Sequence, residues 1–411
     1  MADFILHSDL NCFYVSAEIN EEPSLRGKCV AVCGSTENRH GIVLAKSYEA
    51  KAMGVKTGQV NHEALKACPQ LIMIEPHYEL YLHYSRLVRQ IYTRYSRFIE
   101  PFGMDECWIL LPNLDDISKA EAIAQEIRRT VKQEIGLTVS IGVSFSKVFA
   151  KLGSDMKKPD AVSVISRENY RSLVWPLPVG EILYAGPHTV KKLADVGVYT
   201  IGELARFPEA LIRAKLGKNG VELRRFARGE DGARVAESGY SQPVKSIGHG
   251  ATCVRDLHAN EEVWRVMYEL SQDVSHRLRK HAFLACGVSL GIRYSDLENV
   301  IFQRPLRVPT RSALDIAAGA FELYRAHHEA GRPVRALTVC AGKLSPDGAP
   351  AQCDIFGDSM RVQKRRTLDD AVDDLRGRFG VSCLRAASLL YGTPIATDRC
   401  ETVPMPALMY R

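Results

Sequence analysis

The chain has 411 residues, which suggests roughly two to four domains. Its 46% hydrophobic and 25% charged residues are typical of a globular protein, and its net charge of +6 permits a polyanionic partner without requiring one. No segment approaches the roughly 18 apolar residues of a membrane span, and the first residues do not resemble a secretory signal. We therefore expect a cytoplasmic protein with no membrane partner.

The eleven cysteines are scattered without a CxxC pair. Cys29 and Cys33 are the closest two, and they fall on one face of a predicted strand without histidine partners. This spacing favours core packing over zinc binding, and the thiols suit a reducing compartment.

The first segment, FILHSDL, predicts a buried strand that ends near Asp9, and the following CFYVSAEIN has helical character. KCVAVCG and GIVLAKS predict two short strands, and SYEAKAMG predicts a helix ended by Gly54. These elements indicate a small α/β unit over residues 20–76.

The next segment combines helices with a hairpin. YLHYSRLVRQIYTRYS and ISKAEAIAQEIRRTVKQEIG have the spacing of amphipathic helices, and SRFIEPFGMDECWILL predicts a hairpin with Asp105 and Glu106 at its turn. Two more strands follow, LTVSIGVSF and AVSVI. With the first strand, this order predicts an antiparallel sheet backed on one face by two helices, with Asp9, Asp105 and Glu106 on its open face.

The remaining sequence changes character twice. Residues 167–232 alternate short helices with glycine turns, and residues 241–345 have the order of a split β-α-β-β-α-β domain. A linker, SPDGAP, then leads into a tail with a helical run, TLDDAVDDLRGRFG.

Three acidic residues are candidates for metal ligands. Two Mg²⁺ ions that assist an in-line displacement at phosphorus need hard oxygen ligands, few of which must come from the protein. Asp9, Asp105, Glu106 and the carbonyl of Leu10 supply that set. An acidic pair at a hairpin is by itself more often a solvated turn. The acidic pair in this sequence, however, is accompanied by hydroxyls and cations suited to a triphosphate, at Ser47, Tyr48, Lys51 and Lys158.

These segments carry a family resemblance. From about residue 4 to 345 the chain resembles the Y-family DNA polymerases, through HSDLNCFYVSAE, SYEAKAMGVKTG, GMDECWIL, SIGVSFSKVFAKLGSDMKKPD, AGPHTVKKLADVGVYTIGELA and KSIGHGAT. Six motifs in the family's order are far more specific than any one alone. The resemblance implies an α/β (α+β) multidomain fold of the right-hand type. Its parts are a ferredoxin-like palm (1–19 and 77–166), fingers (20–76), a helix-hairpin-helix thumb (167–232), a split βαβ-type little finger (241–345) and a C-terminal tail (346–411).

The resemblance also implies roles for single residues. Asp9, the Leu10 carbonyl, Asp105 and Glu106 would bind two Mg²⁺ ions, for which Mn²⁺ can substitute, with Asp105 and Glu106 as the catalytic pair. Tyr14 would occupy the steric-gate position beside the incoming sugar. The expected nucleotide contacts are Phe13, Tyr14, Ser47, Tyr48, Lys51 and Lys158.

Three positions depart from the family's pattern. Lys51 stands where most members have Arg, which exchanges a bidentate fork for a point charge. Ala45 stands where some relatives have a phosphate-binding Thr, and Asn11 replaces a frequent second Asp. No metal ligand is lost, so the departures bear on nucleotide affinity.

Primer-template DNA is the expected macromolecular partner. In a helix-hairpin-helix, turns such as those at Gly186 and Gly197 let backbone N–H groups reach a DNA phosphate, although these glycines could also be mere helix stops. Arg255, Arg293, Arg304 and Arg307 lie on or beside predicted strands, where they could contact phosphates or form a solvated sheet face.

The tail contains a candidate docking motif. Gln352, Ile355 and Phe356 in QCDIF resemble the anchors by which bacterial polymerases bind the ring-shaped sliding clamp, with Cys353 in place of the usual Leu. Alternatively, Ile355 and Phe356 pack the predicted helix Thr367–Gly380 onto the little finger.

Together these features favour a monomeric, error-prone polymerase that uses deoxynucleoside triphosphates to copy past damaged template bases. One alternative is a catalytically dead relative that serves as a DNA-binding adaptor, against which the three carboxylates argue. Another is a nucleotidyl cyclase, in which the thumb, little finger and tail would have no purpose.

Overall fold

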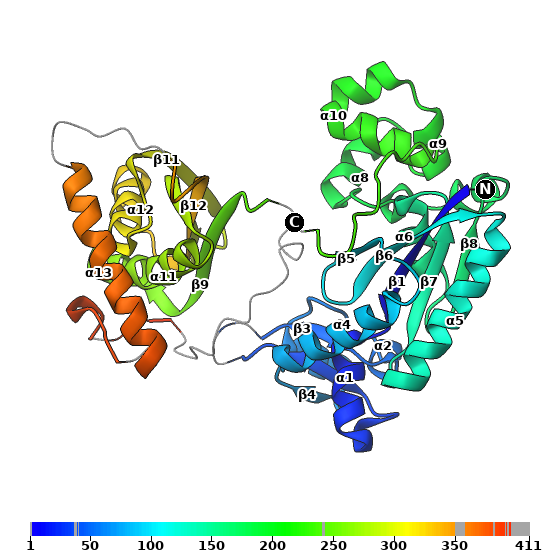
Figure 1. Ribbon diagram of the computed structural model, residues 1–411, viewed down its shortest axis with the longest axis horizontal. Helices are drawn as coiled ribbons and strands as arrows, with labels where there is room; N and C mark the ends of the chain where they lie inside the picture. The colour runs from blue at the N-terminus through cyan, green and yellow to red at the C-terminus, as the bar shows by residue number, and fades with distance from the viewer. Residues whose placement is uncertain are drawn as a thin grey trace. The chain divides into compact units, whose positions relative to one another are not determined.

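The computed structural model describes residues 2–36, 39, 41–240, 243–349, 358–380, 383–390, 392, 394 and 395. These residues form two compact units (Figure 1), the first from residues 2–34 and 42–240 and the second mainly from residues 243–395. Within the described part of the chain, no helix is long and apolar enough to cross a membrane.

The palm sheet forms the centre of the first unit. It has five strands in the order β5-β6-β1-β7-β8, with bounds β1 Ala2–Leu10, β5 Ile99–Phe102, β6 Glu106–Leu114, β7 Val139–Ser144 and β8 Val162–Ile165. The first four of these strands have the ferredoxin-like order that the sequence predicted, and β5 and β6 form the expected hairpin.

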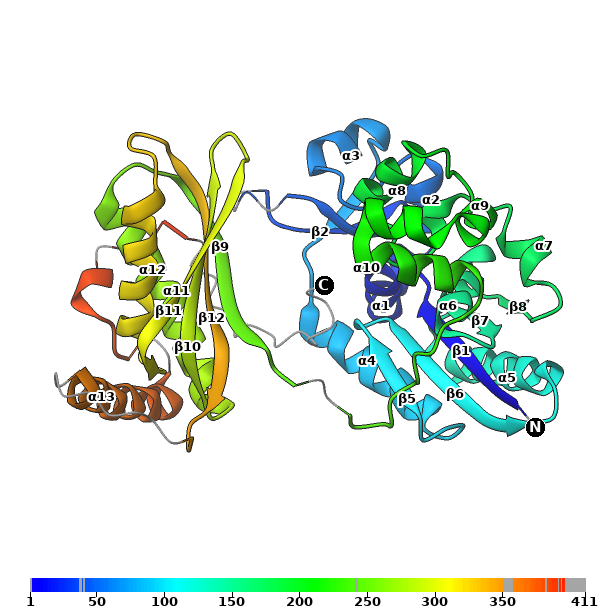
Figure 2. The ribbon, with the colours of Figure 1, turned by 90° about the horizontal axis from the view of Figure 1, so that it is seen from above.

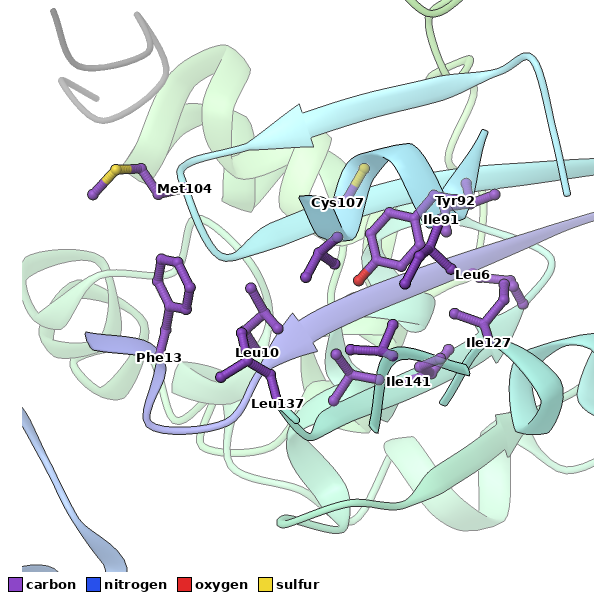
Figure 3. Close-up of a cluster of buried hydrophobic side chains, with 14 of the residues drawn as sticks. Leu6, Leu10, Phe13, Ile91, Tyr92, Met104, Cys107, Ile127, Leu137 and Ile141 are labelled. Atoms are coloured by element: carbon purple, nitrogen blue, oxygen red, sulfur yellow. The ribbon is translucent and has the colours of Figure 1, made fainter. Parts of the chain in front are cut away.

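Strand alternation separates the apolar face of the palm sheet from its polar face. Leu6 and Leu10 of β1 point into a core closed by α4 (Tyr78–Tyr92) and α5 (Ile117–Ile135), as Figure 3 shows. The odd-numbered residues of β1, including His7 and Asp9, point to the other face. The two helices on one face are therefore confirmed.

The other face is not open, because helix α6 (Lys147–Met156) packs on β7, β1 and β8. A Cβ on Gly142 of β7 would lie only 1.9 Å from the carbonyl oxygen of Ala150, so the close approach of α6 requires glycine there. The α6 crossover also makes β8 parallel to β7. The predictions of a wholly antiparallel sheet and an open face were wrong, because the sequence reading placed no helix between these two strands.

The fingers follow α1 (Phe13–Glu21) and contain a three-stranded sheet in the order β3-β2-β4. Its strands are β2 Val30–Cys33, β3 Val43–Lys46 and β4 Ile72–Ile74, with helices α2 (Tyr48–Ala52) and α3 (Asn61–Ala67). Cys33 is buried and Cys29 packs beside it, as expected for core cysteines. The sequence reading missed α3 and β4, which are too short to show a period.

The thumb is built from short helices joined by tight turns. These are α7 (Tyr170–Val174), α8 (Pro187–Ala194), α9 (Ile201–Arg206) and α10 (Glu209–Ala227). α10 is broken at Gly217, whose φ of 64° is non-helical, so the predicted repetition of helix and glycine turn is confirmed.

The second unit contains the predicted β-α-β-β-α-β sequence. Helices α11 (Asn260–Lys280) and α12 (Ala313–His327) cover one face of an antiparallel sheet (Figure 2). The strand order is β11-β10-β12-β9, with bounds β9 Ser246–Leu257, β10 Phe283–Tyr294, β11 Asn299–Thr310 and β12 Val334–Pro346.

The tail contributes a helix to the second unit. The predicted helical run lies within α13 (Asp358–Phe379), which is held by ion pairs such as Arg279–Asp373 at 2.5 Å and Arg311–Asp370 at 2.7 Å. Farther on, Val254 donates its backbone N–H to Pro394 on the edge of β9. Gln352, Ile355 and Phe356 lie outside the described residues.

Candidate active site

Two of the three predicted metal ligands are direct cross-strand neighbours. Asp9 and Glu106 are register partners in the antiparallel pair of β1 and β6, so both side chains project to the face covered by α6. Asp9 is buried, and the Glu106 side chain keeps only 19% of its surface exposed. Two carboxylates that are distant in sequence are therefore brought together in a water-poor environment.

The third carboxylate belongs to a turn that is fixed at several points. The carbonyl of Asp105 accepts the backbone N–H of Leu10 at 3.0 Å, which ties the turn to the end of β1. From α4, Ser85 donates to the Met104 carbonyl and Arg89 donates to the Gly103 carbonyl. The turn that carries Asp105 is consequently held against the strand that carries Asp9.

Two lysines form ion pairs with Asp9 and Glu106. The Nζ of Lys151 on α6 lies 2.8 Å from Glu106 Oε1 and 3.6 Å from Asp9 Oδ2. The Nζ of Lys158 lies 2.8 Å from Asp9 Oδ2 and 2.9 Å from Asp155 Oδ1. The ammonium groups therefore occupy positions beside the carboxylate oxygens where other cations could bind.

The acidic groups differ in their proton affinity. Burial and the nearby negative charges of Asp9 and Glu106 raise the pKa of Asp105 to about 7. Burial also raises the pKa of Asp9 to about 6, against the opposing effect of Lys158. Burial alone would raise the pKa of Glu106, but the adjacent His7 ring and the charge of Lys151 lower it to about 2. The site has more negative charge than its two lysines fully compensate.

His7 on β1 lies next to Glu106 on the same face of the palm sheet. Its ring is completely buried, which lowers its pKa and keeps it neutral. Its Nδ1 lies 2.9 Å from the Ser154 hydroxyl, and its Nε2 lies 3.3 Å from Glu106 Oε2. The ring therefore borders Glu106 on its interior side.

The donor set suits Mg²⁺, although it is not a closed cage. Within the described part of the chain, no three His, Cys, Asp or Glu side chains already converge as a metal site, because the carboxylates face the lysines. Glu106 Oε2 is buried and makes no well-aligned hydrogen bond there, so it retains an unused acceptor. Mg²⁺ keeps waters and substrate phosphates as ligands, so three carboxylates and one carbonyl suffice.

The expected triphosphate contacts in the fingers have different environments. Lys51 is exposed, and its Nζ lies 5.9 Å from the centre of the Tyr48 ring. Ser47 is buried, and its hydroxyl donates to the Lys28 carbonyl while accepting the N–H groups of Ala50 and Val30. That hydroxyl is fully used as the cap of α2, so we withdraw Ser47 as a phosphate contact and assign it to positioning Tyr48 and Lys51.

Asn11, one of the departures from the family's pattern, has a structural role. Its amide donates to the Ser140 hydroxyl at 3.0 Å and accepts the backbone N–H of Asp160 at 2.9 Å. Asp160 is also paired with Arg128 and Lys132 of α5. These contacts fix the loop that presents Lys158 to Asp9.

The two aromatic residues at the start of α1 are not equivalent. Phe13 is 3% exposed and packs in the palm core (Figure 3), so its expected contact with the sugar is replaced by a packing role. Tyr14 is partly exposed, and burial together with the nearby charge of Asp105 raises its pKa. Of these two aromatic residues, Tyr14 is thus the one that remains a candidate for contact with the sugar.

The proposed DNA contacts divide into exposed and engaged groups. Gly186 caps α8 and Gly197, with a φ of 75°, turns the chain after it, as a helix-hairpin-helix requires. Arg293 and Arg307 are exposed on strands β10 and β11, on the sheet face opposite the helices. Arg304 lies an odd number of residues from Arg307, so it faces α12 and pairs with Glu322.

Arg255 is also engaged within the second unit. It pairs with Glu262 in the first turn of α11, although its side chain is 59% exposed. Arg255 and Arg304 therefore have carboxylates of their own domain as charged partners, and their contacts with DNA stay predictions that require these ion pairs to open. The side chains of Arg293 and Arg307 are exposed, as a contact with DNA phosphates would require.

The sequence reading overlooked three side chains of the site. Lys151 and Asp155 stand four residues apart on α6, and His7 stands two residues before Asp9 on β1. Each had a detectable signal. The helical spacing of α6 and the alternation of β1 would have placed them on the face that carries Asp9.

Comparisons with known proteins show the family to which the chain belongs. The sequence model of the impB/mucB/samB family matches residues 8–155, and that of the family's C-terminal domain matches residues 244–355. The DNA polymerase IV of Acetivibrio thermocellus is 43% identical to this chain over 95% of the chain and 98% of that protein. Those of Moorella thermoacetica and Bacillus anthracis are 35% and 34% identical, with at least 93% of each protein covered.

A solved structure shares the fold. It is a Y-family DNA polymerase chimera of Dbh and Dpo4, with a TM-score of 0.74 and 18% sequence identity. The similarity covers 83% of this chain and 99% of the chimera. This chain therefore belongs to the impB/mucB/samB family of Y-family DNA polymerases.

Proposed function

We propose that this protein is a DNA-directed DNA polymerase of the translesion class, which adds deoxynucleotides to a primer 3′ end opposite a template strand. The observation that carries the proposal is the pairing of Asp9 with Glu106 on one face of the palm sheet, next to the turn that carries Asp105, with Lys158 beside Asp9. Relatives named DNA polymerase IV support the reaction class.

Different residues of the chain would bind the metal ions and the triphosphate during nucleotide addition. Asp9, Asp105, Glu106 and the Leu10 carbonyl would hold two divalent ions, with Mg²⁺ as the expected metal. When bound, such ions lower the pKa of an attacking hydroxyl and neutralise charge on the transferred phosphoryl group. Lys158, which pairs with Asp9 in the structure, would bind triphosphate oxygens together with Lys51 and Tyr48.

DNA is held by contacts that do not depend on base sequence. The backbone at Gly186 and Gly197 would bind phosphates of the duplex, and Arg293 and Arg307 would add charge contacts from the little finger. Arg255 and Arg304 could join them only by leaving Glu262 and Glu322. The expected result is general affinity for primer-template junctions that falls as the salt concentration rises.

The proposal includes recruitment by a sliding clamp. Gln352, Ile355 and Phe356 would enter an apolar pocket on the clamp as a short extended peptide. The motif lies between β12 and α13, and the ion pairs of α13 keep the chain that follows it against the little finger. The peptide would thereby be presented next to the domain that binds DNA.

Template-directed primer extension tests the proposal. The purified chain is mixed with Mg²⁺, one deoxynucleoside triphosphate at a time, and four primer-templates that differ in the first unpaired base. The proposal predicts preferential addition of the complementary nucleotide in each case, and extension past an abasic site when all four nucleotides are present. A DNA-binding adaptor would bind all four substrates and extend none.

A further inference from the structure

Tyr14 is supported by a second tyrosine, which is itself fixed by a buried carboxylate. The rings of Tyr14 and Tyr81 stack with centres 4.2 Å apart and planes inclined by 11°. Tyr81 comes from α4 and is fully buried. Tyr78 lies edge-on to both rings, at 6.2 Å and 6.0 Å. Stacked and edge-on contacts of this kind restrict where the Tyr14 ring can lie.

The hydroxyl of Tyr81 is fixed by a hydrogen bond to Glu18. It donates to Glu18 Oε1 at 2.5 Å, and the Glu18 side chain is only 8% exposed. His77 Nδ1 lies 2.9 Å from the same oxygen. A hydrogen bond to a buried carboxylate is stronger than one between neutral groups, so the Tyr81 ring has little freedom to slide or tilt.

The geometry joins the two contacts through one helix. Tyr14 and Glu18 are four residues apart on α1, so they lie on the same helical face. Tyr81 therefore touches α1 twice, through its ring face at Tyr14 and through its hydroxyl at Glu18. The geometry of α1 therefore fixes the distance between Tyr14 and Glu18.

We propose that Glu18 and Tyr81 are positioning residues for sugar selection, which hold the Tyr14 ring where a ribose 2′-hydroxyl would collide with it. The inference rests on the proposed role of Tyr14 as the steric gate. A gate discriminates by excluding one hydroxyl group, so a displacement of about 1 Å is enough to weaken it. The contacts of Tyr81 consequently affect the choice between ribonucleotide and deoxynucleotide more than the rate at which the deoxynucleotide reacts.

The chain supplies a matched control in the next turn of α4. Tyr84 donates its hydroxyl to Glu21 Oε1 at 2.8 Å, so it joins the same two helices by the same kind of hydrogen bond. This pair is exposed, and among the described aromatic contacts none joins Tyr84 to Tyr14. Tyr84→Phe and Glu21→Gln thus remove a comparable contact without touching the gate.

The test measures kcat and KM for a deoxynucleotide and its ribonucleotide in the full chain with Mg²⁺ and a short primer-template. Tyr81→Phe should lower the ratio of the two kcat/KM values about tenfold, mainly by improving use of the ribonucleotide. Glu18→Gln should lower it less, because an acceptor oxygen remains. The Tyr84→Phe and Glu21→Gln ratios should stay within about twofold of the wild-type ratio.

The variant Tyr14→Ala separates the two possible failures. If Tyr14→Ala lowers the ratio while Tyr81→Phe and Glu18→Gln leave it unchanged, the Tyr81 anchor is only structural and the inference is wrong. An unchanged ratio in Tyr14→Ala would overturn the gate assignment itself, and the inference with it. Equal losses of activity on both sugars in Tyr81→Phe would also assign the contact to folding alone.

Discussion

Asp9 and Glu106 face each other across the β1–β6 pair, and Lys151 on α6 contacts both carboxylates at 3.6 Å and 2.8 Å. The backbone thus holds these two carboxylates side by side, and Lys151 compensates part of their negative charge. The divalent cations that we propose here would replace lysine contacts with metal contacts, and the backbone of the site would not need to change. Because the backbone of the site is formed before substrate binds, substrate binding would require no folding step.

Mg²⁺ should stabilise the fold more strongly at pH 8 than at pH 5.5. Burial raises the pKa of Asp9 to about 6 and that of Asp105 to about 7, above the ordinary value of 3.8. For a carboxyl group with a raised folded-state pKa, the stabilising contribution is present at low pH and is lost as pH rises through that value. Ionised carboxylates at pH 8 bind the metal without first losing protons.

The measurement is the thermal midpoint with and without Mg²⁺ at the two pH values. Asp105→Asn serves as the control, because the amide cannot titrate and should reduce the pH dependence. Equal stabilisation of the wild-type chain at both pH values would contradict the assignment of these carboxylates as metal ligands.

Asn11→Ala should weaken both the fold and nucleotide binding. The substitution leaves the Asp160 N–H and the Ser140 hydroxyl without their partner, so the free energy of unfolding should fall by about 1–3 kcal/mol. The loop that carries Lys158 would also loosen, which should raise KM for the nucleotide more than it lowers kcat. Urea denaturation and steady-state kinetics measure the two effects.

Asn20→Ala is the matched control for this prediction. Asn20 donates its amide to the Ile135 carbonyl at the end of α5, so its loss should cost stability without touching Lys158. If both variants change KM equally, Asn11 has no specific link to the nucleotide site.

Tyr14→Ala should admit ribonucleotides, with selectivity falling on the order of 10²-fold. Removal of the ring leaves room where the 2′-hydroxyl would otherwise collide with it. Tyr14→Phe keeps the ring and should retain the wild-type preference. Competition between a ribonucleotide and its deoxy counterpart at one template position measures the ratio, and an unchanged ratio for the alanine variant would place the gate elsewhere.

Replacement of Gln352 and Phe356 by Ala should leave single-nucleotide insertion on a short primer unchanged. The same double variant should lose stimulation by the host's sliding clamp on a closed circular template. The two substitutions remove the side chains at the first and last positions of the docking motif. A full response of the double variant to the clamp would show that the docking site lies in another part of the chain.

Sequence patterns predicted much of this molecule and failed at identifiable points. The hairpin with Asp105 and Glu106, the split second domain and the run of thumb helices all follow from hydrophobic period and turn residues. α6 was missed, and with it the burial of the site and the roles of Lys151 and Asp155. Contacts across distant segments, such as Asn11 with Asp160, have no local signal.

At two single residues the structure shows partners within the chain that the sequence pattern did not indicate. Ser47 was read as a free hydroxyl, but a Ser before a helix is a preferred cap and its hydrogen bonds are satisfied by backbone groups. Arg304 was read as a strand cation, but its parity along β11 turns it toward Glu322. In both cases the residue type suggested a ligand while the neighbouring chain had already supplied a partner.

The most direct test of the account compares wild-type chain with Asp105→Asn and Glu106→Gln in primer extension at several Mg²⁺ concentrations. Loss of one metal-binding carboxylate removes several kcal/mol of transition-state stabilisation, so extension should fall on the order of 10³-fold or more. Affinity for primer-template DNA, measured by fluorescence anisotropy in the same buffers, should change little. Robust extension by either variant would contradict the assignment of these carboxylates to two-metal nucleotide addition.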